Sequence, residues 1–276
     1  DGTLTISGTG AMKDYDYDNN LSPVYNNSNV KKVVIEDGVT SIGNSAFYNC
    51  DGLTSITIPK SVTSIENYAF YNCTGLTSIT IPDSVTSIGD SVFEKCSNLS
   101  NITLSNNITS IESGAFADCS SLTDIVIPNS VTSIGDFAFD WCSNLSSITL
   151  SNNITSIGTF AFNGCSSLTS ITIPDSVTSI ENYAFSGCSS LTSITIPDGV
   201  TSIGNLVFNG CSSLTAISLS CKSSLKKSDF GDQADLVSYT NQHLLTKTEA
   251  KAKTCTEDGN KEYWTCEHCG KYFLSD

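Results

Sequence analysis

The chain has 276 residues, of which 39% are hydrophobic and 15% are charged, enough apolar material for one sizeable fold or two modest ones. Its 28 acidic residues outweigh 13 lysines, no arginine occurs, and the net charge is −15. So acidic a chain would be repelled by a phosphate backbone, which excludes nucleic acid as a partner, and no apolar run is long enough to span a membrane.

Residues 1–29 are expected to form an N-terminal cap. Leu4 and Ile6 alternate with polar residues in T-L-T-I-S, which predicts a strand with one buried face, and Gly8 and Gly10 predict the turn that follows it. The remainder of the segment is polar and reads as a loop. Because the chain begins with Asp1 rather than methionine, we expect a mature form or an excised fragment from which any targeting signal is missing.

A repeat of 23 residues dominates the sequence that follows. Cysteines recur at this interval from Cys50 to Cys211, each with a phenylalanine three residues before it and a leucine three residues after it. The unit L-T-S-I-T-I-P-D-S-V-T-S-I-x-x-x-A-F-x-x-C-x-x begins with an alternating, β-branched run that predicts a strand. Proline, or serine in three units, ends this strand, and a second short extended piece leads into a turn that carries Phe and Cys.

One unit alone cannot fold. Its seven or so apolar side chains contribute roughly 10–20 kcal/mol, whereas ordering the backbone costs roughly 1–2 kcal/mol per residue. Stacked units share their walls, so the sequence predicts a repeat solenoid over residues 24–220: a right-handed, parallel leucine-rich-repeat array with a β-strand face, short strands and helical or 3₁₀ turns. Residues 221–242 retain only echoes of the pattern and are expected to be a degenerate terminal repeat and linker.

The repeated motif I-G-x-x-A-F-x-x-C-x-x-L-x-x-I-x-I-P resembles the BspA-type (treponemal) leucine-rich repeat of bacterial surface proteins. It can be followed over residues 42–59, 88–105 and 203–220. The opening T-L-T-I-S-G-T-G-A-M also resembles the segment that often precedes such arrays. The resemblance implies a solenoid that is displayed on the cell surface or secreted and is used for adhesion or recognition. It does not imply a particular ligand.

Two surfaces are candidates for binding a partner. The solvent-facing strand positions are rich in Thr and Ser and carry one carboxylate, Asp124; such a face suits solvent as well as it suits a partner. The positions that vary most between units lie just before and after Ala-Phe, and variation favours recognition because scaffold positions should match. Trp141 and Asp118, on the preceding coil, are interpreted as a stacking platform with a polar partner, unless the aromatic side chains simply pack over adjacent coils. The varied positions are Tyr68, Tyr71, Lys95, Asp118, Phe137, Trp141, Phe160 and Tyr183.

The eight repeat cysteines are expected to be buried free thiols. Each lies between Phe and Leu, where cysteine behaves as a small hydrophobe. Each interior cysteine would also have an equivalent neighbour on both sides, so pairing would distort a uniform stack. Free thiols in an extracellular protein favour a reducing habitat, and disulfides between coils are the alternative.

Residues 243–276 are predicted to form a separate small Cys/His module. A CxxC-Gly knuckle supplies two thiolates, and the sequence predicts a closed structural zinc site with ligands His243, Cys255, Cys266 and Cys269. So short a segment carries too little apolar surface to fold unaided. A disulfide at Cys255 beside a redox-active CxxC, and free thiols, are the alternatives. The segment resembles small Cys/His modules appended to surface proteins of gut bacteria.

Together these features predict a non-catalytic extracellular binding or adhesion module that recognises host protein or glycan. Only two histidines occur, His243 and His268, so most of the chain lacks an imidazole for acid–base catalysis, and the strand face lacks the convergent carboxylates of a glycosidase. A structural spacer that displays other domains is the first alternative. A carbohydrate-active enzyme on a β-solenoid is the second.

Overall fold

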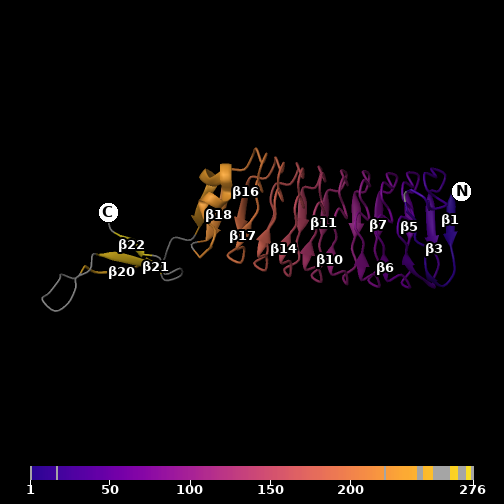
Figure 1. Cartoon of the computed structure of the whole chain (residues 1–276), viewed down its shortest axis with the longest axis horizontal. Coiled ribbons are helices and arrows are strands. Elements are labelled where there is room, and N and C mark those ends of the chain that lie inside the picture. The colour runs from indigo at the N-terminus through magenta and orange to yellow at the C-terminus, as the bar shows by residue number, and fades with distance from the viewer. Residues whose placement is uncertain are drawn as a thin grey trace.

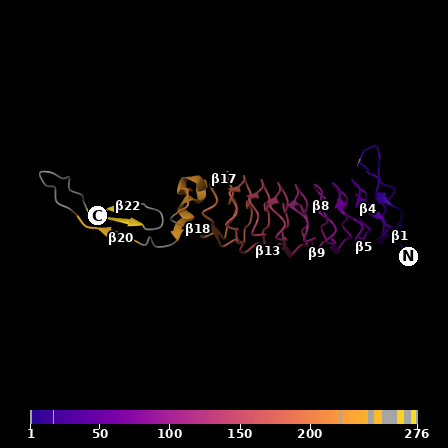
Figure 2. The same ribbon diagram turned by 90° about the horizontal axis from the view of Figure 1, so that it is seen from below.

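The repeats stack into a parallel β-solenoid of about nine turns in the computed structural model, which confirms the predicted fold class. The structure describes residues 2–16, 18–220, 222–240, 245–250, 262–266 and 272–274. The coils lie side by side in a single row from β1 to β18 (Figure 1), and the view turned by 90° shows the same row (Figure 2). The described chain contains little helix: η1 (Lys227–Leu236), a 3₁₀ segment, follows the last coil.

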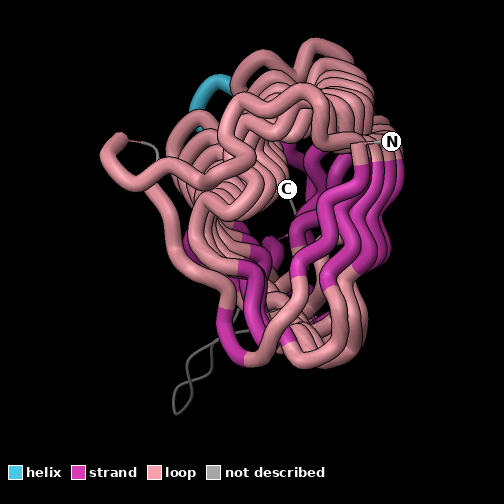
Figure 3. Tube along the Cα trace, turned by 90° about the vertical axis from the view of Figure 1, so that its right-hand side faces the viewer, coloured by secondary structure: helices cyan, strands magenta, loops and turns pink. Residues whose placement is uncertain are grey.

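Two walls of the solenoid consist of strands, which Figure 3 shows in a view along the axis of the array. All strand pairs within these walls are parallel. Equivalent residues of successive repeats lie opposite one another, as Ser64 and Ser87 do. Isoleucines point inward and Ser or Thr outward, because successive strand residues face opposite sides. The first wall, the long-strand wall, contains β1 (Thr3–Ile6), β3 (Lys32–Ile35), β5 (Ser55–Thr57), β7 (Ser78–Thr80), β9 (Asn101–Thr103), β11 (Asp124–Val126), β13 (Ser147–Thr149), β16 (Ser193–Ile196), β18 (Ala216–Ser220) and β19 (Val237–Thr240).

The second wall is built from shorter strands, because only the Ser-Ile pair of most repeats joins its ladder. The wall runs without interruption through β2, β4, β6 and β8 and again from β10 to β17. Its strands are β2 (Gly10–Ala11), β4 (Val39–Ile42), β6 (Ser64–Ile65), β8 (Ser87–Ile88), β10 (Ser110–Ile111), β12 (Ser133–Ile134), β14 (Ser156–Ile157), β15 (Ser179–Ile180) and β17 (Ser202–Ile203).

The third wall consists of stacked turns, which we call the turn wall. Backbone hydrogen bonds join successive turns, as from the Phe139 amide to the Ala161 carbonyl (2.8 Å) and from the Trp141 amide to the Asn163 carbonyl (2.7 Å). These bonds satisfy backbone groups that a single turn would leave unpaired. The turn wall comprises residues 44–49, 67–72, 90–95, 113–118, 136–141, 159–164, 182–187 and 205–210.

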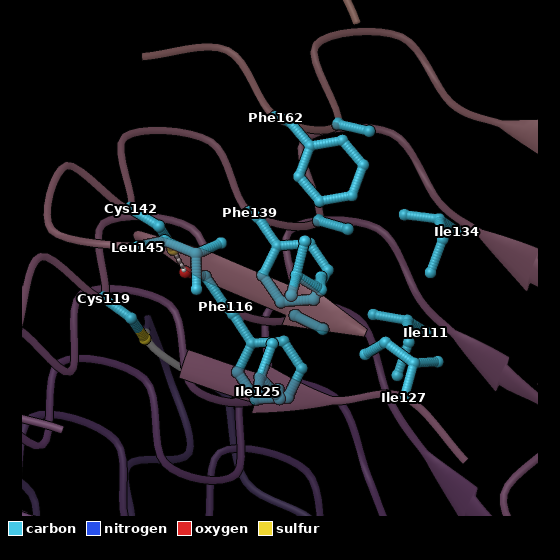
Figure 4. Close-up of a cluster of buried hydrophobic side chains, with 14 of the residues drawn as sticks. Ile111, Phe116, Cys119, Ile125, Ile127, Ile134, Phe139, Cys142, Leu145 and Phe162 are labelled. Atoms are coloured by element: carbon cyan, nitrogen blue, oxygen red, sulfur yellow. Dashed lines mark hydrogen bonds between the residues drawn. The ribbon is translucent and has the colours of Figure 1, made fainter. Parts of the chain in front are cut away.

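A ladder of stacked phenylalanines lies behind the turn wall in the core. Phe139 is fully buried between Phe116 and Phe162, with both centroid separations 5.3 Å and interplanar angles of 13° and 1° (Figure 4). The stack runs from Phe47 to Phe208. Because the ring separation is close to the strand spacing, every coil adds one ring to the column without changing the pitch.

The repeat cysteines have a second role besides filling space. Seven of the eight thiols donate a hydrogen bond to the carbonyl of the phenylalanine on the preceding coil, as from Cys142 Sγ to Phe116 O at 3.0 Å (Figure 4), and Cys50 donates to the carbonyl of Val24. All eight cysteines are free, and all except Cys211 are buried. Burial raises the pKa of Cys96 to about 12, so this thiol keeps the proton that it donates. A small apolar side chain with a weak donor therefore fits this position.

The two ends of the array continue its sheets. β1 pairs with β3 and β2 pairs with β4, so part of residues 1–29, expected to form a cap, extends both strand walls. At the other end β19 pairs with β18, and Phe230 of η1 stacks on Phe208 at 6.5 Å. The strands β20 (Leu245–Thr248), β21 (Tyr263–Cys266) and β22 (Tyr272–Leu274) form an antiparallel sheet with one another.

Candidate binding surface on the turn wall

Two positions on every turn have the left-handed backbone conformation. Position A is the residue two before the core phenylalanine, and position B is the residue before the cysteine; their φ angles lie between 50° and 73°. Glycine adopts this conformation freely, whereas other residues pay roughly 1–2 kcal/mol. Position A is occupied by Ser45, Tyr68, Ser91, Gly114, Phe137, Phe160, Tyr183 and Leu206, and position B by Asn49, Asn72, Lys95, Asp118, Trp141, Gly164, Gly187 and Gly210.

The aromatic residues at these positions are the unusual ones. A positive φ is tolerated by Asn and Asp, but for a bulky side chain it is an outlier that persists only where the surrounding structure enforces it. Glycine at the same phase of other coils shows that the turn can form without them. The aromatic side chains therefore strain the backbone without filling the core. All of the candidate residues that the sequence singled out on the turns, except Tyr71, occupy position A or position B.

Three position-A rings form a ladder on the outside of the turn wall. Phe137 and Phe160 stack at 5.2 Å, and Phe160 and Tyr183 stack at 4.6 Å, so these rings do pack over adjacent coils. The stack begins at Phe137, because position A of the preceding coil is Gly114, which has no side chain. Phe137 consequently remains 41% exposed.

Trp141 is the most exposed ring of the turn wall and leans towards the following coil. A Cβ atom at Gly164 would lie 3.1 Å from Cδ2 and 3.2 Å from Cε3 of the indole, so only glycine at this position leaves room for the ring. The ring is nevertheless 57% exposed. Asp118, its partner in the predicted stacking platform, occupies position B of the preceding coil, on the other side of Trp141 from Gly164.

Carboxylates surround this part of the wall. Burial raises the pKa of Asp140 above its ordinary value; the Asn163 amide, which donates to Asp140 Oδ1 at 2.8 Å, opposes the rise, and the negative charges of Asp118 and Glu94 add to it. Lys95 is the sole cation among the turn-wall residues, and it pairs with Glu94 at 3.4 Å. The wall is therefore acidic as well as aromatic.

A second aromatic group lies towards the N-terminus. Tyr25, Tyr48 and Tyr71 stack at 5.9 and 4.5 Å, and Tyr68 meets Tyr71 edge-on at 6.1 Å. Lys95 donates to the Tyr71 hydroxyl and lies 4.8 Å from the centroid of its ring. Lys95 already covers the end of this stack, so these aromatic residues have their partners within the chain.

Asp124, the carboxylate singled out on the strand face, lies elsewhere. It begins β11 on the long-strand wall, where its neighbour Val126 is 65% exposed. The structure therefore does not bring Asp124 together with the turn-wall residues, and a partner would reach the two surfaces from different sides.

The predicted zinc ligands cannot be placed together. His243, Cys255 and Cys269 lie outside the described residues, and of Cys266 only its backbone position in β21 is described. Within the described part of the chain, no group of three or more His, Cys, Asp or Glu side chains is arranged to hold a metal ion. Nor does that part include a helix long and apolar enough to cross a membrane.

Sequence reasoning identified the varied positions but missed their backbone conformation and the hydrogen bonds of the thiols. A signal for the first was present: glycine and asparagine, the residues that best tolerate a positive φ, recur at position B, as at Asn49, Asn72 and Gly164. No comparable signal marks the thiol donors, since their acceptors are backbone carbonyls on another coil.

Comparison with known proteins identifies the repeat. A family model described as "BspA type Leucine rich repeat region" matches residues 22–146 and 132–252 in six copies. Among solved structures, the T. pallidum leucine-rich repeat protein TpLRR is 33% identical with a TM-score of 0.55, and the alignment covers 66% of this chain and 77% of that one. None of the curated proteins matches the chain.

Another similar structure belongs to a leucine-rich cell surface protein from Faecalibacterium prausnitzii A2-165. It is 34% identical with a TM-score of 0.49, and the alignment covers 77% of this chain and 64% of that one. This chain therefore spans less than two thirds of that protein's length. The pneumococcal vaccine antigen PcpA is 18% identical with a TM-score of 0.40, and the alignment covers 87% of each chain.

Proposed function

Because the chain belongs to the BspA-type leucine-rich repeat family, we propose that it is a non-catalytic binding module that acts outside the cell and recognises a host protein or glycan through its turn wall. Its repeat resembles that of bacterial surface proteins, which supports the location. Its regular stack of coils offers a long, continuous surface, as other solenoid proteins do for their partners.

The observation that carries the proposal is the exposure of strained aromatic residues. Phe137 and Trp141 have positive φ angles of 57° and 56°, remain substantially exposed, and occupy positions where other coils have glycine. A spacer that only displayed other domains would gain stability by losing them. Strain of this kind is typical of functional sites, where the geometry of a side chain matters more than its contribution to folding.

The arrangement of the acids favours binding over catalysis. A glycosidase places two carboxylates on either side of the bond that it cleaves. Asp118 and Asp140 instead lie on an outward-facing wall of turns, and Asp140 accepts a hydrogen bond from Asn163. No histidine occurs among the turn-wall residues to transfer a proton.

An array of glycans and extracellular-matrix proteins, probed with the whole chain, tests the proposal. We expect saturable binding that Trp141→Ala reduces and Val126→Ala, an exposed apolar residue on the long-strand wall, leaves unchanged. Loss of binding only in Val126→Ala would move the site to the strand face. Absence of binding to every member of the array would favour the spacer, and turnover of a polysaccharide would establish an enzyme.

A further inference from the structure

The Trp141 ring has one covered side and one open side. Its covered side lies against Gly164 on the following coil, with the close approach described above. The ring is 57% exposed, and Asp118 occupies the equivalent position B on the preceding coil, about 5 Å away along the stack. A group that rests on the exposed part of the ring would therefore lie within reach of the Asp118 carboxylate.

Asp118 has a free carboxylate with which to meet such a group. Its backbone amide donates to the Asp140 carbonyl at 2.7 Å, but none of the described residues donates a hydrogen bond to its side chain or forms an ion pair with it. The carboxylate also lies close enough to Asp140 to disfavour the charged form of that residue. A cation between Asp118 and Trp141 would offset this repulsion.

The net negative charge of the whole turn wall also favours a cationic partner. Its eight turns carry five acidic residues and one lysine, and that lysine is paired with Glu94 and lies on the Tyr71 ring. An anionic partner would be repelled, and a neutral sugar would leave the clustered carboxylates uncompensated. Lysine and arginine suit both elements of the site, since they bind carboxylates and also the faces of aromatic rings.

The neighbouring ladder indicates a polypeptide rather than a small cation. Phe137, on the same turn as Trp141, begins a ladder that continues through Phe160 and Tyr183 over two coil steps, with ring separations of 5.2 and 4.6 Å. This length matches about three residues of extended chain. Lysine and arginine also carry long apolar stems, which can lie along such rings while the charged end reaches a carboxylate.

We propose that the turn wall binds a lysine- or arginine-rich segment of a partner protein, with one cationic side chain held between the open face of Trp141 and the Asp118 carboxylate. The inference rests on the proposed binding function and specifies the chemistry of the partner. The Phe137–Phe160–Tyr183 ladder contacts the apolar parts of the same segment.

Fluorescence anisotropy with a labelled peptide tests this assignment. The probe is a nonapeptide with lysine at every third position, separated by Gly and Ser; its matched counterpart carries acetyl-lysine, which keeps the stem and removes the charge. We expect the whole chain to bind the lysine peptide and not the acetylated one. Trp141→Ala and Asp118→Asn should each weaken binding roughly 3- to 30-fold. Both replacements suit the left-handed backbone at least as well as the native residue does, and unchanged melting temperatures verify folding.

Two further variants separate this site from the general attraction of a cation to an acidic chain. Asp124→Asn, on the long-strand wall, changes the net charge by the same amount as Asp118→Asn, and we expect it to leave the affinity unchanged within about twofold. Trp141→Leu keeps apolar area but removes the ring, and we expect it to bind as weakly as Trp141→Ala. Equal effects of Asp118→Asn and Asp124→Asn, or full affinity in Trp141→Leu, would overturn the inference.

The same measurements separate this inference from the proposed function. Trp141-dependent binding to a neutral glycan, without binding to the lysine peptide, would overturn the cationic partner and leave the binding module in place. Absence of binding to the peptide and to every member of the glycan and matrix-protein array would overturn both.

Discussion

Replacing Gly164 by alanine measures how closely the Trp141 ring approaches the next coil. Gly164 has a φ of 71°, and an added Cβ would lie 3.1 Å from the indole. Gly210 has nearly the same φ, 73°, but an added Cβ there would meet only Gly187 backbone atoms, at 3.5 Å or more. Gly164→Ala and Gly210→Ala therefore share the cost of placing alanine in the left-handed conformation, about 1 kcal/mol. Only Gly164→Ala adds a close contact with the Trp141 indole.

We expect Gly210→Ala to lower the free energy of unfolding by about 1 kcal/mol and Gly164→Ala by about 2–3 kcal/mol, since overpacking adds to the strain. Urea denaturation in the presence of reductant provides both values. In a Trp141→Ala background the extra cost at Gly164 should disappear, because the double-mutant cycle then removes the contact itself. Equal costs at Gly164 and Gly210, or an extra cost that survives the loss of Trp141, would show that the ring lies elsewhere.

Three further predictions concern the core, the thiols and the tail. Phe139→Ala interrupts the ring column and should destabilise the chain by about 3–5 kcal/mol in urea denaturation, with a smaller loss for Phe208→Ala near its end; an unchanged midpoint for Phe139→Ala would remove that ring from the core. At about pH 8, an aromatic disulfide reagent should label Cys211 before the other seven repeat thiols, because a hydrogen bond with Cys188 lowers the pKa of Cys211; the same bond raises the pKa of Cys188, and burial raises the pKa of the other six. Cys211→Ser should remove that fast thiol, and an unchanged labelling rate would contradict the order. Elemental analysis should find about one zinc per chain, lost in Cys266→Ser without a change in the melting of the solenoid; a metal-free chain with Cys255 in a disulfide would contradict the zinc site.

The architecture followed from the sequence because a strict period fixes which residues lie above one another. Once Cys, Phe and Leu repeat in phase, stacking is the arrangement that buries all three, whatever the local propensities are. Local sequence does not decide which segments pair as strands. Residues 169–173 and 192–196 both read T-S-I-T-I, yet the structure assigns a strand, β16, only to the second, where Ser193–Ile196 pairs with β18. Pairing depends on the neighbouring coil, which a single repeat does not encode.

The candidate surface was less accessible from the sequence than the fold. Variation between repeats identified Trp141 and Asp118 as neighbours, because their spacing equals the period. The direction in which the indole leans depends on a left-handed backbone and on the absence of a side chain at Gly164, so the sequence alone does not predict it. The sequence shows a lysine, Lys95, on the turn wall but does not show its partners. The structure pairs Lys95 with Glu94 and Tyr71, so the turn wall has no unpaired cation.

The stack of coils also determines how the chain would respond to tension. Coils hydrogen-bond and pack only to the coils before and after them, so a pull along the axis is opposed by one interface at a time rather than by the whole array. Each 23-residue coil that peels away from an end would release about 75 Å of extended chain while the remaining coils keep their structure. The coils near the middle of the array would therefore be the last to separate, and a partner bound at the middle of the turn wall would be the last to lose its surface.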